Sequence, residues 1–340
     1  MTVRAIRGAI TVDKNDEKRM LEKTKKLVLR LIKENNIEPE DVINIIFSVT
    51  SDLNKVYPAK AVRELGYLDI PLMCLSEAFV EGSLEKCIRV LIQVNSNKKN
   101  KEIKHIYLGG AMGLRSDLSK NISIAIDGPA GAGKSTIADL VSKKLSVIHV
   151  DTGAMYRAVA YDAFNKGIDI KSETDVEKIL KDIEYNQEYI NGAQKIYLNG
   201  DDITGKIRTP EISAGASDVA KLACVRTKLT EIQRNMAKNQ SVIMDGRDIG
   251  SFVLQDADLK IFLTASVEER AKRRYKDLVQ KGIKNVKIEE VEKDIIARDE
   301  NDSNRKISPL KMADDAVLLD TTGMTIEEVV NKIIELVEDI

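Results

Sequence analysis

The first third of the chain combines short apolar runs with one long amphipathic stripe. Residues 42–50 (VINIIFSVT) are almost uninterruptedly apolar, which is typical of a buried strand. Residues 14–35 instead repeat apolar side chains at helical spacing. Further strands are predicted at residues 3–12, 70–75, 87–94 and 105–108, and a short helix at residues 57–65. Strands that alternate with helices in this way predict a mixed α/β domain.

The rest of the chain continues the alternation on both sides of a glycine-rich turn. Residues 122–127 alternate as a strand does before this turn, and an amphipathic helix begins after it. Further strands are predicted at residues 147–151, 241–245, 258–265 and 317–320, a β-hairpin at 185–203, and helices after residue 151 and at 211–221, 225–238, 268–280, 288–298 and 326–337. This order predicts a doubly wound α/β fold with a parallel sheet, whose ligands gather at the carboxyl ends of the strands.

The glycine-rich turn has the spacing of a phosphate-binding loop. It consists of Gly128, Pro129, Ala130, Gly131, Ala132, Gly133, Lys134 and Ser135, with Thr136 next. Glycines adopt positive φ, which lets successive N–H groups surround an anion, while Lys134 can reach the outer phosphates of ATP and Ser135 can hold Mg²⁺. A glycine-rich turn with a chance lysine is the alternative. The strand before the loop and the helix after it favour a nucleoside triphosphate site.

Length and composition indicate the number of domains and argue against some classes of partner. With 340 residues the chain is long enough for two domains, which we place at residues 1–118 and 119–340. The 53 lysines and arginines balance the 54 aspartates and glutamates. The chain therefore lacks the basic excess that would indicate a nucleic-acid partner. The 3 cysteines are widely spaced, which favours a reducing compartment and argues against a zinc site. Neither a signal core nor a membrane span is predicted, so we expect a cytoplasmic protein.

Charged residues interrupt the apolar strands of the first domain. Arg7 lies inside AIRGAITV, Arg89 lies inside CIRVLIQV, and Glu77 ends PLMCLSE. Charges inside strands are costly unless they are paired or face a ligand. A structural ion-pair network and an anion-binding site both explain them, and the residues alone leave the two open.

Arginines accumulate in the second domain. Arg270, Arg273 and Arg274 share one predicted helix, and Arg298 and Arg305 flank an acidic stretch. Any single one is typical of a solvated helix face. Together with Arg157, Arg226 and Arg247 they exceed what a triphosphate requires. A second phosphate site and a closing lid explain the surplus, because phosphoryl transfer is stabilised by several cations and Mg²⁺.

The motifs of the first domain are IRGAITV, DLNKVYPAKAVRELG, CLSE, GSLEKCIRVL, HIYL and LRSDL. In this order they resemble the trimeric, barrel-type chorismate mutases. The resemblance implies a trimer-forming barrel that rearranges chorismate to prephenate without a cofactor. It implies that Arg89 stabilises negative charge on the ether oxygen in the transition state, that Glu77 positions Arg89 and bonds the substrate hydroxyl, and that Arg7 and Tyr107 bind carboxylates. It places Cys74 beside Glu77 as a further substrate-binding residue. The other implied residues line a cleft shared between subunits: Tyr57, Arg63 and Arg115.

The motifs of the second domain are IAIDGPAGAGKST, DTGAMYR, NGDDITGKIRTPEIS, DGRDIG, ASVEERAKRR and ARDENDSNRKISPL. They resemble the bacterial cytidylate kinases over residues 122–340. The resemblance implies transfer of the γ-phosphate of MgATP to CMP or dCMP, with UMP as a weaker acceptor. It implies catalytic roles for Lys134 and for a lid arginine, Arg273 or Arg274. The implied substrate-binding residues are Thr152, Arg157, Ser217, Arg226, Arg247, Asp248, Arg298, Asp302 and Arg305.

We therefore predict a bifunctional enzyme with small-molecule substrates, a homotrimer through its first domain, and no nucleic-acid or membrane partner. Two other functions stay open. In one alternative, the first domain is a trimeric binding or regulatory module without turnover; its retained charged residues argue against this. In the other, the phosphate-loop part is an ATPase of nucleic-acid or signalling systems; the balanced charge argues against this. His105 and His149 lack a partner pattern, and we assign them no chemistry.

Overall fold

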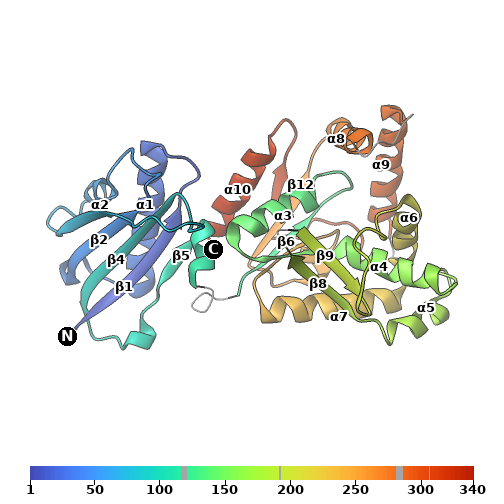
Figure 1. Cartoon of the computed structure of the whole chain (residues 1–340), viewed down its shortest axis with the longest axis horizontal. Helices are drawn as coiled ribbons and strands as arrows, with labels where there is room; N and C mark the ends of the chain where they lie inside the picture. Colours follow the sequence, from blue (N-terminus) through green and yellow to red (C-terminus); the bar gives the residue numbers. More distant parts are fainter. Residues whose placement is uncertain (116–120, 191–192, 281–285, 306) are drawn as a thin grey trace. The chain divides into compact units, whose positions relative to one another are not determined.

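The structure is a computed structural model that describes residues 1–115, 121–190, 193–280, 286–305 and 307–340. The chain divides into two units, one formed mainly by residues up to 115 and the other mainly by residues from 121 on (Figure 1). None of the helices in the described ranges is long and apolar enough to cross a membrane.

A five-stranded sheet of order β3-β2-β4-β1-β5 forms the first unit. Its strands are β1 (Thr2–Thr11), β2 (Val42–Val49), β3 (Leu72–Ser76), β4 (Cys87–Ser96) and β5 (Ile106–Leu108). β1 and β2 pair antiparallel with β4, whereas β5 runs parallel to β1 and β3 runs parallel to β2. The predicted mixed α/β fold is confirmed. Within one chain the sheet is open, and the trimer-forming barrel stays a prediction.

Helix α1 (Glu17–Asn35) supplies much of the core on one face of this sheet. Its Leu27 and Leu31 are fully buried together with Ile6 of β1 and Phe47 of β2. The helix starts at residue 17 rather than at the predicted residue 14, because the Asp16 side chain caps it by accepting a hydrogen bond from the backbone of the third helical residue. The unit also contains α2 (Ala59–Glu64) and the 3-10 segments Pro39–Asp41, Asn100–Glu102 and Gly109–Arg115.

A second five-stranded sheet, of order β13-β12-β6-β11-β7, is entirely parallel. Its strands are β6 (Ser123–Asp127), β7 (Ile148–Asp151), β11 (Val242–Asp245), β12 (Leu259–Thr264) and β13 (Val317–Asp320). The helices of this part of the chain are α3 (Lys134–Leu145), α4 (Thr152–Asn165), α5 (Glu173–Leu180), α6 (Pro210–Val219), α7 (Ala223–Asn239), α8 (Val267–Gln280), α9 (Ile288–Ser303) and α10 (Ile326–Glu338). The predicted parallel, doubly wound α/β fold is confirmed.

The predicted hairpin is a small antiparallel sheet of order β10-β9-β8. It consists of β8 (Tyr185–Ile190), β9 (Ala193–Leu198) and β10 (Asp201–Asp202). The predicted Asn-Gly turn joins β9 to β10, where Asn199 and Gly200 both adopt positive φ, at 51° and 88°. Such a turn matches the twist of the strands that it connects.

Candidate active sites

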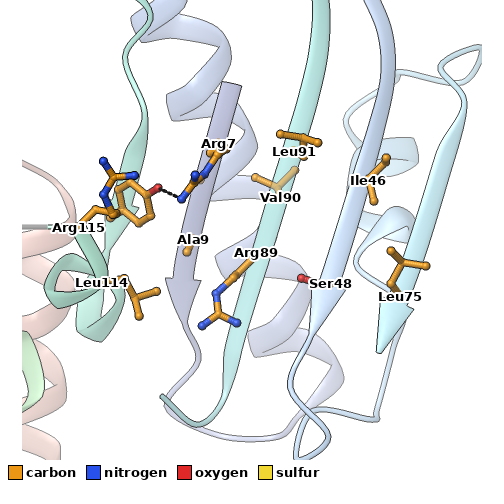
Figure 2. Close-up of a pocket in the computed structure, with 12 residues that line it drawn as sticks. Arg7, Ala9, Ile46, Ser48, Leu75, Arg89, Val90, Leu91, Leu114 and Arg115 are labelled. Carbon is orange, nitrogen blue, oxygen red and sulfur yellow. Dashed lines mark hydrogen bonds between the residues drawn. The ribbon is translucent and has the colours of Figure 1, made fainter. Parts of the chain in front are cut away.

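A cavity of about 470 Å³ opens on the first sheet, on the side that carries the charged strand residues (Figure 2). Its lining includes four of the predicted site residues, Arg7, Arg89, Tyr107 and Arg115. Most of the other lining residues are apolar and come from the strands and from the 3-10 segment 109–115. A concave apolar wall with a few converging cations is suited to a small organic anion.

Glu77 holds Arg89 in place from just beyond the end of β3. The Nη1 group of Arg89 donates to Glu77 Oε2, and Ser48 Oγ on β2 donates to the other carboxylate oxygen at 2.7 Å. Contacts on both carboxylate oxygens orient this carboxylate, and with it the guanidinium. Burial lowers the pKa of Arg89 below its usual value. An anion in the cavity would offset that cost of burial.

Arg7 and Tyr107 form a second polar pair at the cavity. Arg7 Nη2 donates to Tyr107 Oη at 3.2 Å, and the backbone N–H of Arg7 donates to His105 Nδ1 at 3.1 Å. His105, for which no partner was predicted, thus contacts the backbone of β1. Burial lowers the pKa of His105, and the positive charges of Arg7 and Arg115 lower it further. The predicted carboxylate binders therefore create a positive field here.

Besides Glu77, three predicted residues are not part of the cavity lining in their own chain. Tyr57 is 76% exposed, and Arg63 is exposed on α2. Cys74 packs against the core of the unit, where burial raises the pKa of its thiol. Successive strand residues point to opposite faces, so Leu75 lines the cavity and Cys74 does not. A cleft completed by Tyr57 and Arg63 would have to take them from another chain.

The phosphate loop joins the end of β6 to the start of α3, as predicted. Its Gly128, Gly131 and Gly133 all adopt positive φ, at 146°, 74° and 87°. Lys134 is buried, and its Nζ donates to the carbonyl oxygen of Pro129 at 2.8 Å. Burial lowers the pKa of Lys134 to about 7, and the charge of Arg247 acts in the same direction. A triphosphate would restore the charge on this lysine.

Asp127, at the end of β6, fixes the segment that follows β11. Its two carboxylate oxygens accept the backbone N–H groups of Ile249 (2.8 Å) and Gly250 (2.7 Å) in the π-helical turn Ile249–Val253. Burial raises the pKa of Asp127 to about 6, against the effect of these two hydrogen bonds. Asp127 therefore contributes to the shape of the site through the backbone.

Asp245, at the end of β11, connects three elements beside the phosphate loop. Its Oδ2 accepts Ser135 Oγ at 2.6 Å, its Oδ1 contacts His149 Nε2 at 2.7 Å, and its carbonyl oxygen accepts Thr152 Oγ1 at 2.7 Å. The sequence pattern indicates no partner for His149, because this contact joins β7 to β11 over a sequence separation of 96. The sequence predicts Asp245 only as the last residue of the strand at 241–245.

A cluster of arginines surrounds Asp302 on α9. Arg247 Nε contacts Asp302 Oδ2 at 2.7 Å, and Arg305 Nη2 contacts Asp302 Oδ1. Burial opposes the ionisation of Asp302, but Arg247 and Arg305 outweigh it and hold its pKa below the usual value. Burial lowers the pKa of Arg298, as do the charges of Arg274 and Arg247. Four residues predicted to bind substrate are thus brought together: Arg247, Arg298, Asp302 and Arg305.

Two further ion pairs lie near the strand ends, and each contains a predicted arginine. Arg226 is buried, contacts Asp248, and lies over the ring of Tyr156 with its guanidinium carbon 5.8 Å from the ring centroid. Arg157 contacts Asp151, the cap of its own helix α4, at 2.8 Å. In each pair a carboxylate fixes the position of an arginine side chain.

Among the residues that the structure describes, Ser217 and the two candidate lid arginines make no ion pair with the cluster around Asp302. Ser217 is exposed on α6, where its hydroxyl donates to the carbonyl oxygen of Ser213. Arg273 donates to the side chain and carbonyl oxygen of Thr321 and contacts Glu269 at 2.9 Å. Arg274 is exposed, and its charge acts on Arg298. Of the two, Arg274 is the one whose charge reaches the arginine cluster.

Comparison with known proteins matches the two parts of the chain to two different families. The family model for cytidylate kinase matches residues 124–339, and the family model for chorismate mutase type I matches residues 3–118. A cytidylate kinase of Caldicellulosiruptor saccharolyticus is 50% identical over 217 residues, which are 64% of this chain and 96% of that protein. A cytidylate kinase of Bacillus licheniformis is 50% identical over 225 residues, 65% of this chain and 98% of that protein. A solved chorismate mutase from Clostridium thermocellum is 47% identical, with 32% of this chain and 98% of that one covered and a TM-score of 0.32.

Proposed function

Because the chain belongs to the cytidylate kinase family through its second part and to the type I chorismate mutases through its first, we propose that it is a bifunctional enzyme. It rearranges chorismate to prephenate, and it transfers the γ-phosphate of ATP to CMP or dCMP. The observation that carries the proposal is that each match coincides with a site of its own, the cavity at Arg89 and the phosphate loop at Lys134. We place the domain boundary between residues 118 and 119.

The cavity of the first unit is suited to the rearrangement. In this intramolecular step an ether C–O bond breaks while a C–C bond forms, and negative charge grows on the ether oxygen. Arg89, held by Glu77, would stabilise that charge more in the transition state than in the bound substrate, which lowers the barrier. Arg7, Tyr107 and Arg115 would hold the two carboxylates and confine the flexible dianion. The reaction needs no external acid, base or electron acceptor.

The second unit binds ATP through its phosphate loop in this proposal. Backbone N–H groups of the loop and the start of α3 would surround the phosphates, and Lys134 would exchange its bond to Pro129 for one to a phosphate oxygen. Ser135 Oγ and the Asp245 carboxylate, 2.6 Å apart, are oxygen ligands of the kind that Mg²⁺ prefers together with substrate phosphates. Bound there, Mg²⁺ would neutralise charge on the transferring group.

The acceptor monophosphate would occupy the arginine cluster. Arg247 and Arg298 would hold its phosphate, Asp302 the ribose, and Arg226 with Asp248 the base side. Arg274 would act as the lid arginine and stabilise charge on the transferring phosphoryl group. Several fixed cations, rather than covalent chemistry, therefore account for catalysis.

Acceptor specificity tests the kinase part. We expect ADP to form from MgATP rapidly with CMP or dCMP, more slowly with UMP, and at background rate without an acceptor. Phosphate release without any acceptor would contradict the kinase assignment and favour an ATPase. A coupled assay for ADP, run with each acceptor in turn, separates these results.

We also propose that the first unit forms a homotrimer. Large apolar side chains are exposed on and after its edge strand β3: Met73 is 55% exposed, Phe79 84% and Val80 60%. Exposed apolar residues grouped in this way are typical of an interface between chains. A neighbouring chain would also supply Tyr57 and Arg63 to the cavity. Light scattering after size exclusion should give the mass of three chains; the mass of one chain at micromolar concentration would contradict the trimer.

A further inference from the structure

Helices α8 and α9 hold the backbone of the phosphate loop from its outer side. Asp299 Oδ1 on α9 accepts the backbone N–H of Ala130 at 2.9 Å. Arg270 Nη1 on α8 donates to the carbonyl oxygen of Ala130 at 2.9 Å and to Asp299 Oδ2 at 2.5 Å. Both polar groups of one loop residue are thus bound by a single ion pair.

Arg270 is buried in this contact, and Asp299 is half-buried. The Arg270 side chain is 6% exposed and that of Asp299 20%, and Arg270 Nε makes a further bond to the carbonyl oxygen of Ala265 at 3.0 Å. A Cβ atom at Gly131, the next loop residue, would lie 3.3 Å from Arg270 Cβ and 3.5 Å from Ile295 Cδ1. Charge-assisted bonds in such a place are strong and directional, so the loop and the two helices should move together.

Helix α9 also carries the proposed acceptor site. Asp299 follows Arg298 directly, and Asp302 lies one helical turn further on, bound to Arg247 and Arg305. One helix therefore contacts the phosphate loop through Asp299 and the acceptor cluster through Arg298 and Asp302. A ligand that fixes the position of α9 would also fix Ala130.

We propose that Arg270 and Asp299 are positioning residues that couple the two nucleotide sites, an inference that rests on the proposed kinase function. The acceptor bound at α9 favours the loop conformation that holds the ATP phosphates, and by thermodynamic reciprocity ATP favours acceptor binding to the same degree. Neither residue need touch a substrate.

Calorimetric titration of the full chain tests this coupling. The ligand is the Mg²⁺ complex of a non-hydrolysable ATP analogue, titrated with and without saturating CMP, and the ratio of the two dissociation constants is the coupling factor. For the unaltered chain we expect a factor of about five or more. Asp299→Ala should bring the coupling factor to within about twofold of one, because the substitution removes the contact of Asp299 with Arg270 and its bond to the Ala130 N–H. The affinity for CMP alone should change less than about threefold, since Arg247, Arg298 and Asp302 remain.

Two further variants make the result specific. Asp299→Asn keeps an oxygen for the Ala130 N–H but loses the charge, so its coupling factor should lie between the two extremes; it also serves if Asp299→Ala fails to fold. Asp315→Ala is the matched control, because it removes the carboxylate partner (2.8 Å) of another buried cation, Lys260, and should leave the factor unchanged.

The opposite results are equally defined. A coupling factor in Asp299→Ala equal to that of the unaltered chain would overturn the inference and make the ion pair merely structural. A factor of one in the unaltered chain would do the same. Failure of the unaltered chain to bind CMP at all would overturn the kinase assignment, and this inference with it.

Discussion

In the proposed mutase site Glu77 orients Arg89, and a substitution can remove this carboxylate while leaving the guanidinium in the chain. Glu77→Ala removes the carboxylate that orients the guanidinium, while the positive charge stays at the cavity. Loss of one charge-assisted contact of this kind should lower kcat for prephenate formation by about 10- to 100-fold. Ser48→Ala is the control, because it removes the other bond of Glu77 but leaves Arg89 in place; its kcat should fall less than about tenfold. A Glu77→Ala enzyme with unchanged kcat would contradict the role of the pair.

Lys134 should take up a proton when the triphosphate binds. Its pKa, lowered to about 7, leaves the side chain largely neutral at pH 8, and the phosphates raise that pKa again. Protons therefore move from solvent to protein, by about half to one proton per site at pH 8. Titrations of a non-hydrolysable ATP analogue in buffers of different ionisation enthalpy measure this number, and Lys134→Met should abolish it. Proton release, or none, at pH 8 would contradict the burial of a neutral lysine.

At the scale of the element, the phosphate loop offers a matched pair of glycines. A Cβ atom at Gly128 would lie 2.0 Å from the carbonyl oxygen of Leu263, whereas a Cβ atom at Gly133 would meet no neighbouring heavy atom within 4 Å. Both glycines have positive φ. Gly128→Ala should destabilise the unit by about 3 kcal/mol or more, and Gly133→Ala by about 1–2 kcal/mol from backbone strain alone. The thermal transition that shifts when nucleotide is added reports on this unit. Equal shifts in the two variants would contradict the packing of β6 against β12.

The same loop shows why much of the fold could be predicted from sequence. Its strand, turn and helix are contiguous, so residues 122–136 contain the whole signal. The exposed face of the first sheet was predictable for a similar reason, because Arg7 and Arg89 interrupt apolar strands. Helix α5 was missed: it has 8 residues, and only Val176, Ile179 and Leu180 of them are buried.

Contacts between distant segments could not be predicted in the same way. His149 meets Asp245 only because β7 and β11 are neighbours in the sheet, and Asp299 meets Ala130 only because α9 lies beside the loop. Pattern analysis places each residue on an element but does not say which elements are adjacent. The roles of Arg7, Glu77 and Arg298 came from resemblance to known families, not from their spacing.

At the scale of the whole molecule, the two proposed activities share no substrate or product. Each site is built from residues of its own kind of unit, with the first site completed by the first unit of a neighbouring chain in the proposed trimer. A substitution in one site should therefore leave the other activity unchanged. The fusion would then join two independent catalysts in one chain.

The most direct test assays both reactions on one preparation of the full chain. Prephenate formation from chorismate and CMP-dependent ADP formation are measured for the unaltered protein, for Arg89→Ala and for Lys134→Ala. The unaltered protein should catalyse both reactions. Arg89→Ala should lose prephenate formation by about 100-fold or more and keep the kinase, and Lys134→Ala should show the reverse. An unaltered protein that phosphorylates CMP but forms no prephenate, or a single substitution that abolishes both reactions in a folded chain, would contradict the bifunctional assignment.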